Sequence, residues 1–191
     1  MIKKSKKTEI SHVKIVQDGD PVLRELAQPV HVKDITSPKI VKIIDDMKTA
    51  LASQDDGVAI AAPQIAVPLQ IFVVSGVVLD SALEKMRYNK EDLQKKKSED
   101  MVFINPVITK LSREKSEMEE GCLSVRYLYG KIKRSTKATI RAYNERGEKI
   151  ERGASGLLAE IFQHETDHLN GVLFTDKAYD IQEILPDHPQ R

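Results

Sequence analysis

The stretch LLAEIFQHETDHLNG, residues 157–171, contains two histidines four positions apart with a glutamate beside the first. On a helix, residues four apart lie on one face, so His164 and His168 can bind the same metal ion. Glu165 can then reach a water molecule on that ion, as metal-dependent hydrolysis requires. Two histidines can fall at helical spacing by coincidence, but the glutamate between them and the apolar run before them favour a metal site.

A catalytic metal site usually has three protein ligands and one open position, so a third ligand is needed. Downstream of the predicted helix, Asp176, Asp180 and His188 are poor candidates. Cys122 is a better one, because a thiolate with two imidazoles forms a soft, tightly held site. Considered alone, a single cysteine is more simply explained as a small buried residue.

The composition is that of an ordinary globular protein. The 191 residues are 40% hydrophobic and 31% charged, with a formal net charge of +1, which suits one domain over residues 1–191. A net charge this close to zero does not predict a nucleic-acid partner. No apolar run approaches the ~20 residues of a membrane span, so the sequence does not predict a membrane partner either. The single cysteine excludes an internal disulfide and suits a reducing cytoplasm. Residues 1–12 are interpreted as a solvated basic tail, with a ribosome contact as the alternative.

Helical and alternating patterns predict a mixture of helices and strands. After Ser37-Pro38, a cap followed by proline, apolar residues three and four apart predict an amphipathic helix that ends near residue 54. A second helix carries the histidines, with Ser155 as its cap and Gly171 at its end. The predicted strands are residues 13–17, 71–74, 77–78, 102–104 continuing over 107–111, and 137–143 in a hairpin with 149–152.

Four other segments are expected to be less regular. Asn105-Pro106 should place its strand at an edge or an end, because proline has no N–H to donate. Residues 112–120 are charged and turn-like, and residues 181–185 suggest a final helical turn. Residues 79–100 are interpreted as an insertion over the surface, more simply a solvated loop than a binding element.

Three stretches resemble the three signature motifs of the peptide deformylases. They are GVAIAAPQ at residues 57–64, EGCLS at residues 120–124 and QHETDH at residues 163–168, in the order in which the family has them. Residues 20–24 and 171–174 are also similar to the family, so the resemblance spans residues 13 to 176. Three motifs in one order are hard to match by chance.

The resemblance implies an α+β fold in which antiparallel β-sheets pack around the central helix that carries His-Glu-x-x-His. It also implies a metallohydrolase that removes the N-formyl group from N-formylmethionyl peptides and releases formate. The metal is expected to be Fe²⁺, with Zn²⁺, Ni²⁺ or Co²⁺ as alternatives, because metal availability decides among the ions that a Cys-His-His site accepts. The expected protein is a cytoplasmic monomer without a membrane or specific nucleic-acid partner.

The same resemblance gives roles to individual residues. The matching metal ligands are Cys122, His164 and His168. Glu165 matches the general base, which takes a proton from water and passes it to the leaving amine. Gln64 and the backbone N–H of Leu123 match the donors that stabilise the developing oxyanion.

A pocket for the methionine side chain can be placed partly from helix geometry. Leu157, Glu160 and Ile161 precede His164 by seven, four and three residues, so they share its face. Leu157 and Ile161 suit an apolar pocket with Val58 opposite. Glu160 does not suit it and is expected either at the rim of the pocket or, as the favoured alternative, turned into solvent.

Small residues are expected to form the groove that receives the peptide backbone. The candidates are Gly57, Val58, Ala59 and Gly121. The family usually has glycine where this chain has Ala59, so a methyl group there is expected to narrow the groove or to conflict with a positive φ. Residues 124–130 lack the proline that often follows the second motif, and Tyr129 is a candidate residue of the rim.

Two other functions are compatible with the sequence. One is a metal-binding relative that holds N-termini without turnover, which only Ala59 and Glu160 support. The other is a zinc endopeptidase built on the same helix, disfavoured because no convincing third ligand lies downstream. Strong peptide binding without formate release would favour the first, and casein cleavage that survives Cys122→Ala would favour the second.

Overall fold

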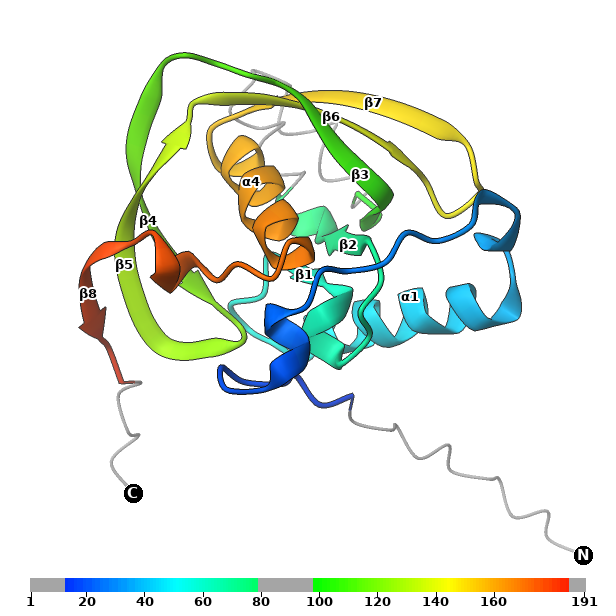
Figure 1. Ribbon diagram of the computed structural model, residues 1–191, viewed down its shortest axis with the longest axis horizontal. Helices are drawn as coiled ribbons and strands as arrows, with labels where there is room; N and C mark the ends of the chain where they lie inside the picture. Colours follow the sequence, from blue (N-terminus) through cyan, green and yellow to red (C-terminus); the bar gives the residue numbers. More distant parts are fainter. Residues whose placement is uncertain (1–12, 79–97, 186–191) are drawn as a thin grey trace, which may run out of the picture.

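The computed structural model describes residues 13–78 and 98–185 and has an α+β architecture (Figure 1). Its strands form two antiparallel sheets, one of five strands in the order β1-β2-β3-β6-β7 and one of three in the order β4-β5-β8. The strands are β1 (Ala59–Ala61), β2 (Ile71–Val74), β3 (Met101–Leu111), β4 (Lys115–Cys122), β5 (Val125–Ser135), β6 (Lys137–Tyr143), β7 (Lys149–Ser155) and β8 (Tyr179–Glu183). The fold class predicted from the sequence is confirmed.

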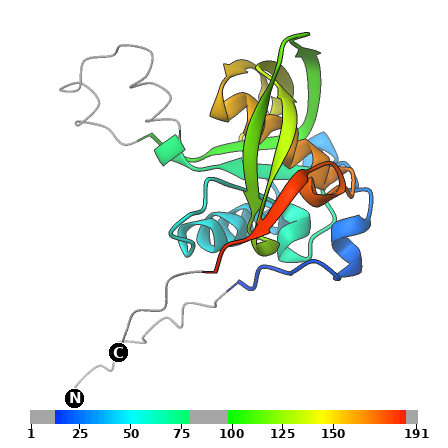
Figure 2. The same cartoon turned by 90° about the vertical axis from the view of Figure 1, so that its left-hand side faces the viewer.

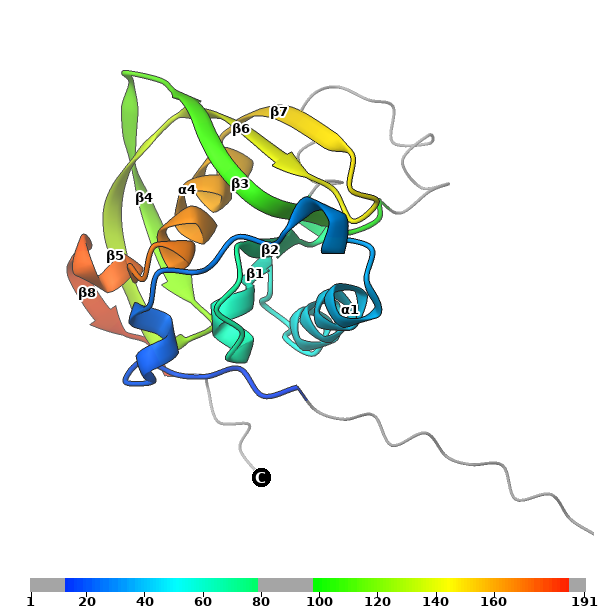
Figure 3. The ribbon, with the colours of Figure 1, turned by 45° about the vertical axis from the view of Figure 1, so that its right-hand side comes forward.

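The helix α4 (Leu157–Leu169) lies between the two sheets (Figure 3). Its apolar side packs against the five-stranded sheet, where three phenylalanine rings meet. Phe72 stacks on Phe103 with ring centroids 4.7 Å apart, and Phe162 meets Phe103 edge-on at 5.2 Å. Such contacts add to the free energy gained by burying the rings, so they hold α4 in one position on the sheet.

The helix α1 (Pro38–Ala52) covers the opposite face of the β1-β2 end of this sheet. The side chain of Ser37 accepts a hydrogen bond from the N–H of Ile40, which confirms the predicted cap. Ile44 and Met47 are buried against Ile60 and neighbouring apolar residues. Because α1 covers one face and α4 the other, every residue of β1 and β2 is buried, which explains their unbroken apolar pattern.

The three-stranded sheet consists of the β4-β5 hairpin with β8 at its edge (Figure 2). Short 3₁₀ helices connect the remaining segments: η1 (Pro21–Arg24), η2 (Val32–Asp34), η3 (Ala62–Ile65) and η4 (Phe174–Asp176). The predicted pairing of residues 137–143 with 149–152 is confirmed, and β7 extends it to Ser155.

Several predicted elements are wrong. Residues 13–17 form no strand, and residues 76–78 are helical where 77–78 were expected to be a strand. The charged segment 112–120 is mostly β4, and residues 181–185 belong largely to β8 rather than to a helical turn. In β4 the inward positions include serine and glutamate, so the alternation is real but is not an alternation of apolar and polar residues.

The structure corrects two predictions, one for the cap of the histidine-bearing helix and one for the place of Asn105-Pro106 in its strand. Ser155 ends β7, and the N-cap position of α4 is Gly156, with φ 57° and no side-chain cap. Asn105-Pro106 lies within β3, an inner strand, at a register irregularity where Asn105 has φ 50°. A bulge is the one interior position of a sheet that tolerates proline, because the ladder bond is already interrupted there.

The two ends of the connection between β2 and β3 lie next to each other. Val74 is opposite Met101 in the ladder, and the N–H of Gly76 donates to Oδ1 of Asp100 at 2.9 Å. A Cβ atom on Gly76 would lie 1.9 Å from the carbonyl oxygen of Ser98, so only glycine allows this approach. Most of the predicted insertion, the basic tail and His188 lie outside the described residues.

Candidate active site

The helix α4 and the end of β4 bring the three predicted ligands together. The ring centroids of His164 and His168 are 4.9 Å apart. Sγ of Cys122 lies 3.2 Å from Nε2 of His168, and the candidate ligand atoms of all three residues lie within 4.8 Å of one another. A cysteine 42 residues before His164 in the chain thus meets the helix at the position that a third ligand requires.

The downstream alternatives are engaged elsewhere. Asp176 accepts a hydrogen bond from Arg24 at 2.6 Å and another from the N–H of Leu173 at 3.0 Å. Asp180 forms an ion pair with Lys131. Neither carboxylate belongs to the cluster of candidate ligands found among the described residues.

A buried carboxylate orients His164. Oε2 of Glu120 lies 2.9 Å from Nδ1 of His164, and Arg134 binds both carboxylate oxygens of Glu120 at 2.7 and 2.9 Å. Burial opposes ionisation of Glu120, but the hydrogen bonds from Arg134 and His164 prevail and lower its pKa to about 2. Because Glu120 is ionised, Nδ1 of His164 is the donor, and its Nε2 is left to act as a ligand.

The network continues from Arg134 toward the surface. Nη1 of Arg134 donates to Asp167 at 2.6 Å, and Asp167 also binds Lys177 at 2.8 Å. The sequence offered no local signal for these partners, because they come from β5, α4 and the segment after η4. Together these charged residues link the turns of α4 that carry His164 and His168 to the three-stranded sheet.

Cys122 and Glu165 also have shifted pKa values, and two buried polar atoms of the site lack partners. Burial opposes the thiolate of Cys122, but the neighbouring His168 and His164 lower the pKa of the thiol to about 5. Burial raises the pKa of Glu165 above its ordinary value, and Oε2 of this carboxyl is buried without a hydrogen-bond partner in the described structure. Nδ1 of His168 is likewise unmatched. Buried polar atoms without partners are typical of a site that binds a further group.

Gln64 approaches the cluster from η3. Its Oε1 accepts the N–H of Ala61 at 2.8 Å, which turns the amide nitrogen toward the site. Nε2 lies 3.2 Å from Oγ of Ser124 and 3.5 Å from Sγ of Cys122. Leu123 lies in the tight turn between β4 and β5, where its carbonyl accepts a hydrogen bond from Gln17.

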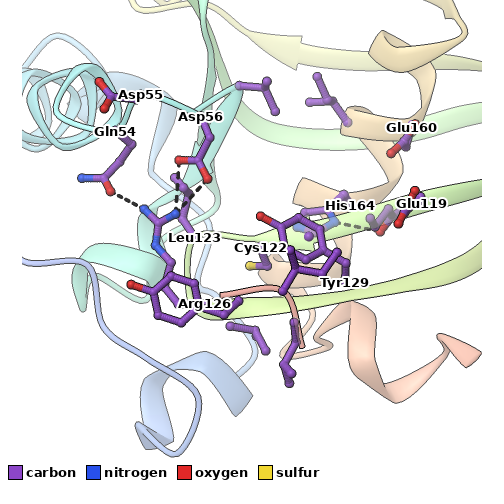
Figure 4. Close-up of a pocket in the computed structure, with 18 of the residues that line it drawn as sticks. Gln54, Asp55, Asp56, Glu119, Cys122, Leu123, Arg126, Tyr129, Glu160 and His164 are labelled. Carbon is purple, nitrogen blue, oxygen red and sulfur yellow. Dashed lines mark hydrogen bonds and ion pairs between the residues drawn. The ribbon is translucent and has the colours of Figure 1, made fainter. Parts of the chain in front are cut away.

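A cavity of about 670 Å³ opens beside these residues (Figure 4). One wall is α4 and another is the β4-β5 hairpin, while residues 53–56, Val58 and residues 184–185 complete the lining. Of the residues predicted to bind substrate, the lining includes Val58, Gly121, Tyr129, Leu157 and Ile161. It does not include Gly57 or Ala59, so their predicted contact with substrate stays a prediction.

The structure explains the positions of the small residues. Ala59 is buried in β1 and packs in the core cluster with α4, and it has no positive φ, so the expected backbone conflict is wrong. A Cβ atom on Gly121 would lie 2.7 Å from Cε1 of Tyr129. Gly121 therefore allows the Tyr129 ring to lie against the strand.

Glu160 corrects another expectation. Solvent was the favoured of its two expected positions, but the residue is half-buried and lines the cavity between Leu157 and Ile161. Figure 4 shows its carboxylate on the same side of the cavity as His164. Burial, followed by the charge of Glu120, raises the pKa of Glu160 to about 7.

An ion pair at the other side of the cavity was not predicted. Arg126, at the start of β5, donates to both oxygens of Asp56 at 3.1 and 2.9 Å and also bonds to Gln54. Figure 4 shows these three residues opposite Glu160. Ile184 and Leu185, after β8, are exposed and complete this part of the lining.

Comparisons with known proteins agree with this geometry. The family model of polypeptide deformylase matches residues 12–183. Peptide deformylase 1A of Arabidopsis thaliana, a chloroplastic/mitochondrial protein, is 42% identical over 90% of this chain and 63% of its own length. The peptide deformylase of Carboxydothermus hydrogenoformans is 40% identical over 88% of this chain and 94% of its own.

Solved structures with the same fold are also deformylases. The class I type b peptide deformylase of Acinetobacter baumannii with Met-Ala-Ser bound has a TM-score of 0.73 and 30% identity, and covers 87% of this chain and 98% of that chain. The peptide deformylase of Thermotoga maritima has a TM-score of 0.71 and 33% identity, with coverages of 88% and 98%.

A His-Glu-x-x-His helix that faces a cysteine beside an open cavity defines the protein as a hydrolase with a candidate metal centre. The match over residues 12–183 is more specific: the chain belongs to the polypeptide deformylase family. It removes the N-formyl group from nascent peptides, a reaction for which this family depends on a metal. No helix of the described residues is long and apolar enough to cross a membrane.

Proposed function

We propose that deformylation takes place at the cluster of Cys122, His164 and His168, with these side chains as ligands of one divalent metal ion. The observation that carries the proposal is Glu165, a buried carboxyl in the cavity lining whose Oε2 has no partner among the described residues. This oxygen makes no hydrogen bond that would stabilise the described fold. Hydrolysis, by contrast, requires a proton acceptor within reach of the attacking water.

The donor set fits a metal ion. The ligand atoms lie within 4.8 Å of one another, and the lowered pKa of Cys122 favours the thiolate that metals bind. A bound ion supplies Lewis acidity, which acidifies water and polarises the formyl oxygen. We expect Fe²⁺, with Zn²⁺, Ni²⁺ or Co²⁺ as alternatives, because one thiolate and two imidazoles suit each of these ions.

Glu165 serves as the general base. Its raised pKa makes the carboxylate a better proton acceptor than an exposed glutamate. It takes a proton from the water that attacks the formyl carbon and returns that proton to the nitrogen as the C–N bond breaks. The peptide leaves with a free amino terminus, and the formyl group leaves as formate with the oxygen of water.

Gln64 and Leu123 stabilise the negative charge that develops on the formyl oxygen. The amide of Gln64 is already held by Ala61, so its N–H₂ group is pre-oriented toward the cluster. The backbone N–H of Leu123 is the second donor. Donors that are fixed before the reaction stabilise the transition state without a cost of reorganisation, and loss of one reduces kcat about 100-fold or more.

The cavity receives the peptide. Leu157, Ile161 and Val58 supply apolar surface for the first side chain, and Gly121 with Tyr129 forms the rim. Gly57 precedes β1 and Ala59 begins it, seven and five residues before Gln64, and their proposed role is to leave room for the peptide backbone. An N-formylmethionyl peptide satisfies this combination of an apolar first side chain and a free formyl carbonyl.

Formate release tests the proposal. Protein prepared anaerobically with Fe²⁺ is expected to release formate from formyl-Met-Ala-Ser, because oxidation of the thiolate or the metal would inactivate it. Glu165→Ala should lower kcat by about 100-fold or more while metal content is unchanged. Cys122→Ala should lose the metal as well as the activity. Equal kcat for Glu165→Ala and the wild type, at equal metal content, would contradict the proposed role.

We further infer that the protein acts as a monomer in the cytoplasm, on nascent chains. A contact of residues 1–12 with the ribosome is the alternative for the basic tail. Light scattering should give the mass of one chain. Co-sedimentation with ribosomes, compared between the full chain and a variant that lacks residues 1–12, tests the role of the tail.

A further inference from the structure

One charged residue interrupts the apolar wall of the cavity. Leu157, Glu160, Ile161 and His164 occupy one face of α4 at spacings of three and four residues, and all four line the cavity. Leu157 and Ile161 are the apolar residues expected around a methionine side chain. Glu160 places a carboxylate between them, in a position where an apolar residue would give a continuous surface.

The carboxylate of Glu160 has no hydrogen-bond or ion-pair partner in the parts of the chain that the structure describes, 13–78 and 98–185. Arg126 lines the cavity and Arg134 is close enough to affect the pKa of Glu160, but both bind other groups: Arg134 binds Glu120 and Asp167, and Arg126 binds Asp56 and Gln54. The raised pKa of Glu160 has the same origin, since burial and the negative Glu120 both disfavour its charge. The charges of His164 and Arg134 offset this effect only in part, and within residues 13–78 and 98–185 the Glu160 carboxylate has no direct partner.

We propose that Glu160 determines first-side-chain specificity: its unpaired carboxylate weakens the binding of an apolar first side chain and favours a formylated peptide whose first side chain ends in a cation. The inference rests on the proposed function, because it takes the cavity as the pocket for that side chain. It concerns the substrate class that this chain accepts in addition to formylmethionyl peptides.

The physical reason is the balance between desolvation and pairing. A methionine side chain that enters the cavity removes water from Glu160 and offers no hydrogen-bond donor in exchange, which costs binding free energy. A lysine side chain brings an ammonium group that pairs with the carboxylate. Its methylene groups still contact Leu157 and Ile161, because long cationic side chains bury their stems against apolar surface.

Matched substrates isolate the charge. Formyl-Lys-Ala-Ser, formylated only on the α-amine, and formyl-norleucine-Ala-Ser differ by the terminal ammonium group. At pH 8, where most Glu160 carboxyls are ionised, the ratio of kcat/KM for the lysine over the norleucine peptide should be about tenfold higher in the wild type than in Glu160→Leu. For formyl-Met-Ala-Ser, Glu160→Leu should raise kcat/KM several-fold through KM, with kcat little changed.

Two further variants separate the charge of Glu160 from other effects. Glu160→Gln keeps the size and polarity, so it should lose the preference for lysine as Glu160→Leu does. Glu119→Gln removes an exposed carboxylate of the same cavity on β4 and should change the ratio much less. An equal change in Glu119→Gln, or an unchanged ratio in both Glu160 variants, would overturn the inference.

Direct binding gives a readout that does not depend on turnover. In the Glu165→Ala background, dissociation constants of the lysine and norleucine peptides should show the same ratio and the same loss in Glu160→Leu. If this binding preference is present but the wild type releases no formate, the proposed function fails and the inference stands. If formate is released but the binding preference is absent, only the inference fails.

Discussion

Oε2 of Glu120 lies 2.9 Å from Nδ1 of His164, and the same carboxylate is held by Arg134, whose side chain is 6% exposed. Glu120 also lies two residues before Cys122 on β4. One strand therefore supplies both a candidate ligand and the group that orients a second ligand. Arg134 extends this arrangement to Asp167, which lies between the two histidines in the chain.

Glu120→Gln should weaken metal binding. The neutral amide no longer fixes the tautomer of His164 or balances the charge of Arg134, and loss of such an orienting group typically costs about 10- to 100-fold in metal affinity. Competition with a chelator measures the affinity. Glu119→Gln, on the same strand but exposed, is the matched control and should leave the affinity unchanged. Equal affinities of Glu120→Gln and the wild type would show that His164 is oriented without Glu120.

Gly121→Ala should destabilise the protein through Tyr129. The added methyl group would lie 2.7 Å from Cε1 and 2.9 Å from Cδ1 of the ring, so the ring must move. Overpacking of this kind costs about 1–3 kcal/mol. In a Tyr129→Ala background the same change should cost much less, and urea denaturation of the four proteins measures the coupling free energy. Additive effects would mean that the ring is not the obstacle.

Gly171→Ala should be more harmful than Gly147→Ala. Both glycines have positive φ, 71° and 77°, so both variants incur backbone strain of about 1–2 kcal/mol. Only at Gly171 would the new Cβ meet backbone, 2.6 Å from the carbonyl oxygen of Arg24, while nothing lies within 4 Å at Gly147. The difference in unfolding free energy between the two variants measures the steric part. Equal values would contradict the close contact.

Asp176 should contribute stability that disappears in acid. Burial opposes its charge, but hydrogen bonds from Arg24 and from the N–H of Leu173 lower the pKa of Asp176. Because the folded pKa is below the unfolded one, the contribution is present above about pH 4 and is lost as the pH falls through the folded value.

Asp176→Asn should therefore be less stable than the wild type at pH 6, and the difference should shrink below pH 4. The pair is about two-fifths exposed, so the effect should not exceed about 1 kcal/mol. Urea denaturation at pH 6 and pH 3 measures it, with Arg24→Gln as the control that removes the partner. A difference that is the same at both pH values would exclude the charge of Asp176 as its source.

The parts of the fold that could be predicted are those whose structure depends on residues close together in the sequence. Helix α1 has an apolar stripe with a Ser-Pro start, and the β6-β7 hairpin has alternating residues on both sides of a turn. The convergence of Cys122 on α4 followed from the number of ligands that a metal needs, and its order in the chain followed from the resemblance.

The remaining features depend on partners distant in sequence. In β4, buried Glu120 is stable because Arg134 of β5 and His164 of α4 bind it, and no pattern within residues 112–120 contains that information. The same is true of Arg126, which binds Gln54 and Asp56 on the side of the cavity opposite Glu160. Glu160 was misplaced because a general preference of glutamate for solvent was applied to a helix face whose neighbours line a cavity.

The close approach of Gly76 to Ser98 and its hydrogen bond to Asp100 have a practical consequence. The chain leaves the end of β2 and returns to the start of β3 through a single narrow junction, and the described residues on its two sides, 75–78 and 98–100, do not line the cavity. The entropic cost of closing a loop grows slowly with its length. Doubling the length of this connection should therefore cost only about 0.6 kcal/mol of folding free energy. The connection that this junction closes is therefore the position at which a fluorescent reporter or an affinity tag can be inserted while both ends of this deformylase chain and its catalytic centre stay as they are.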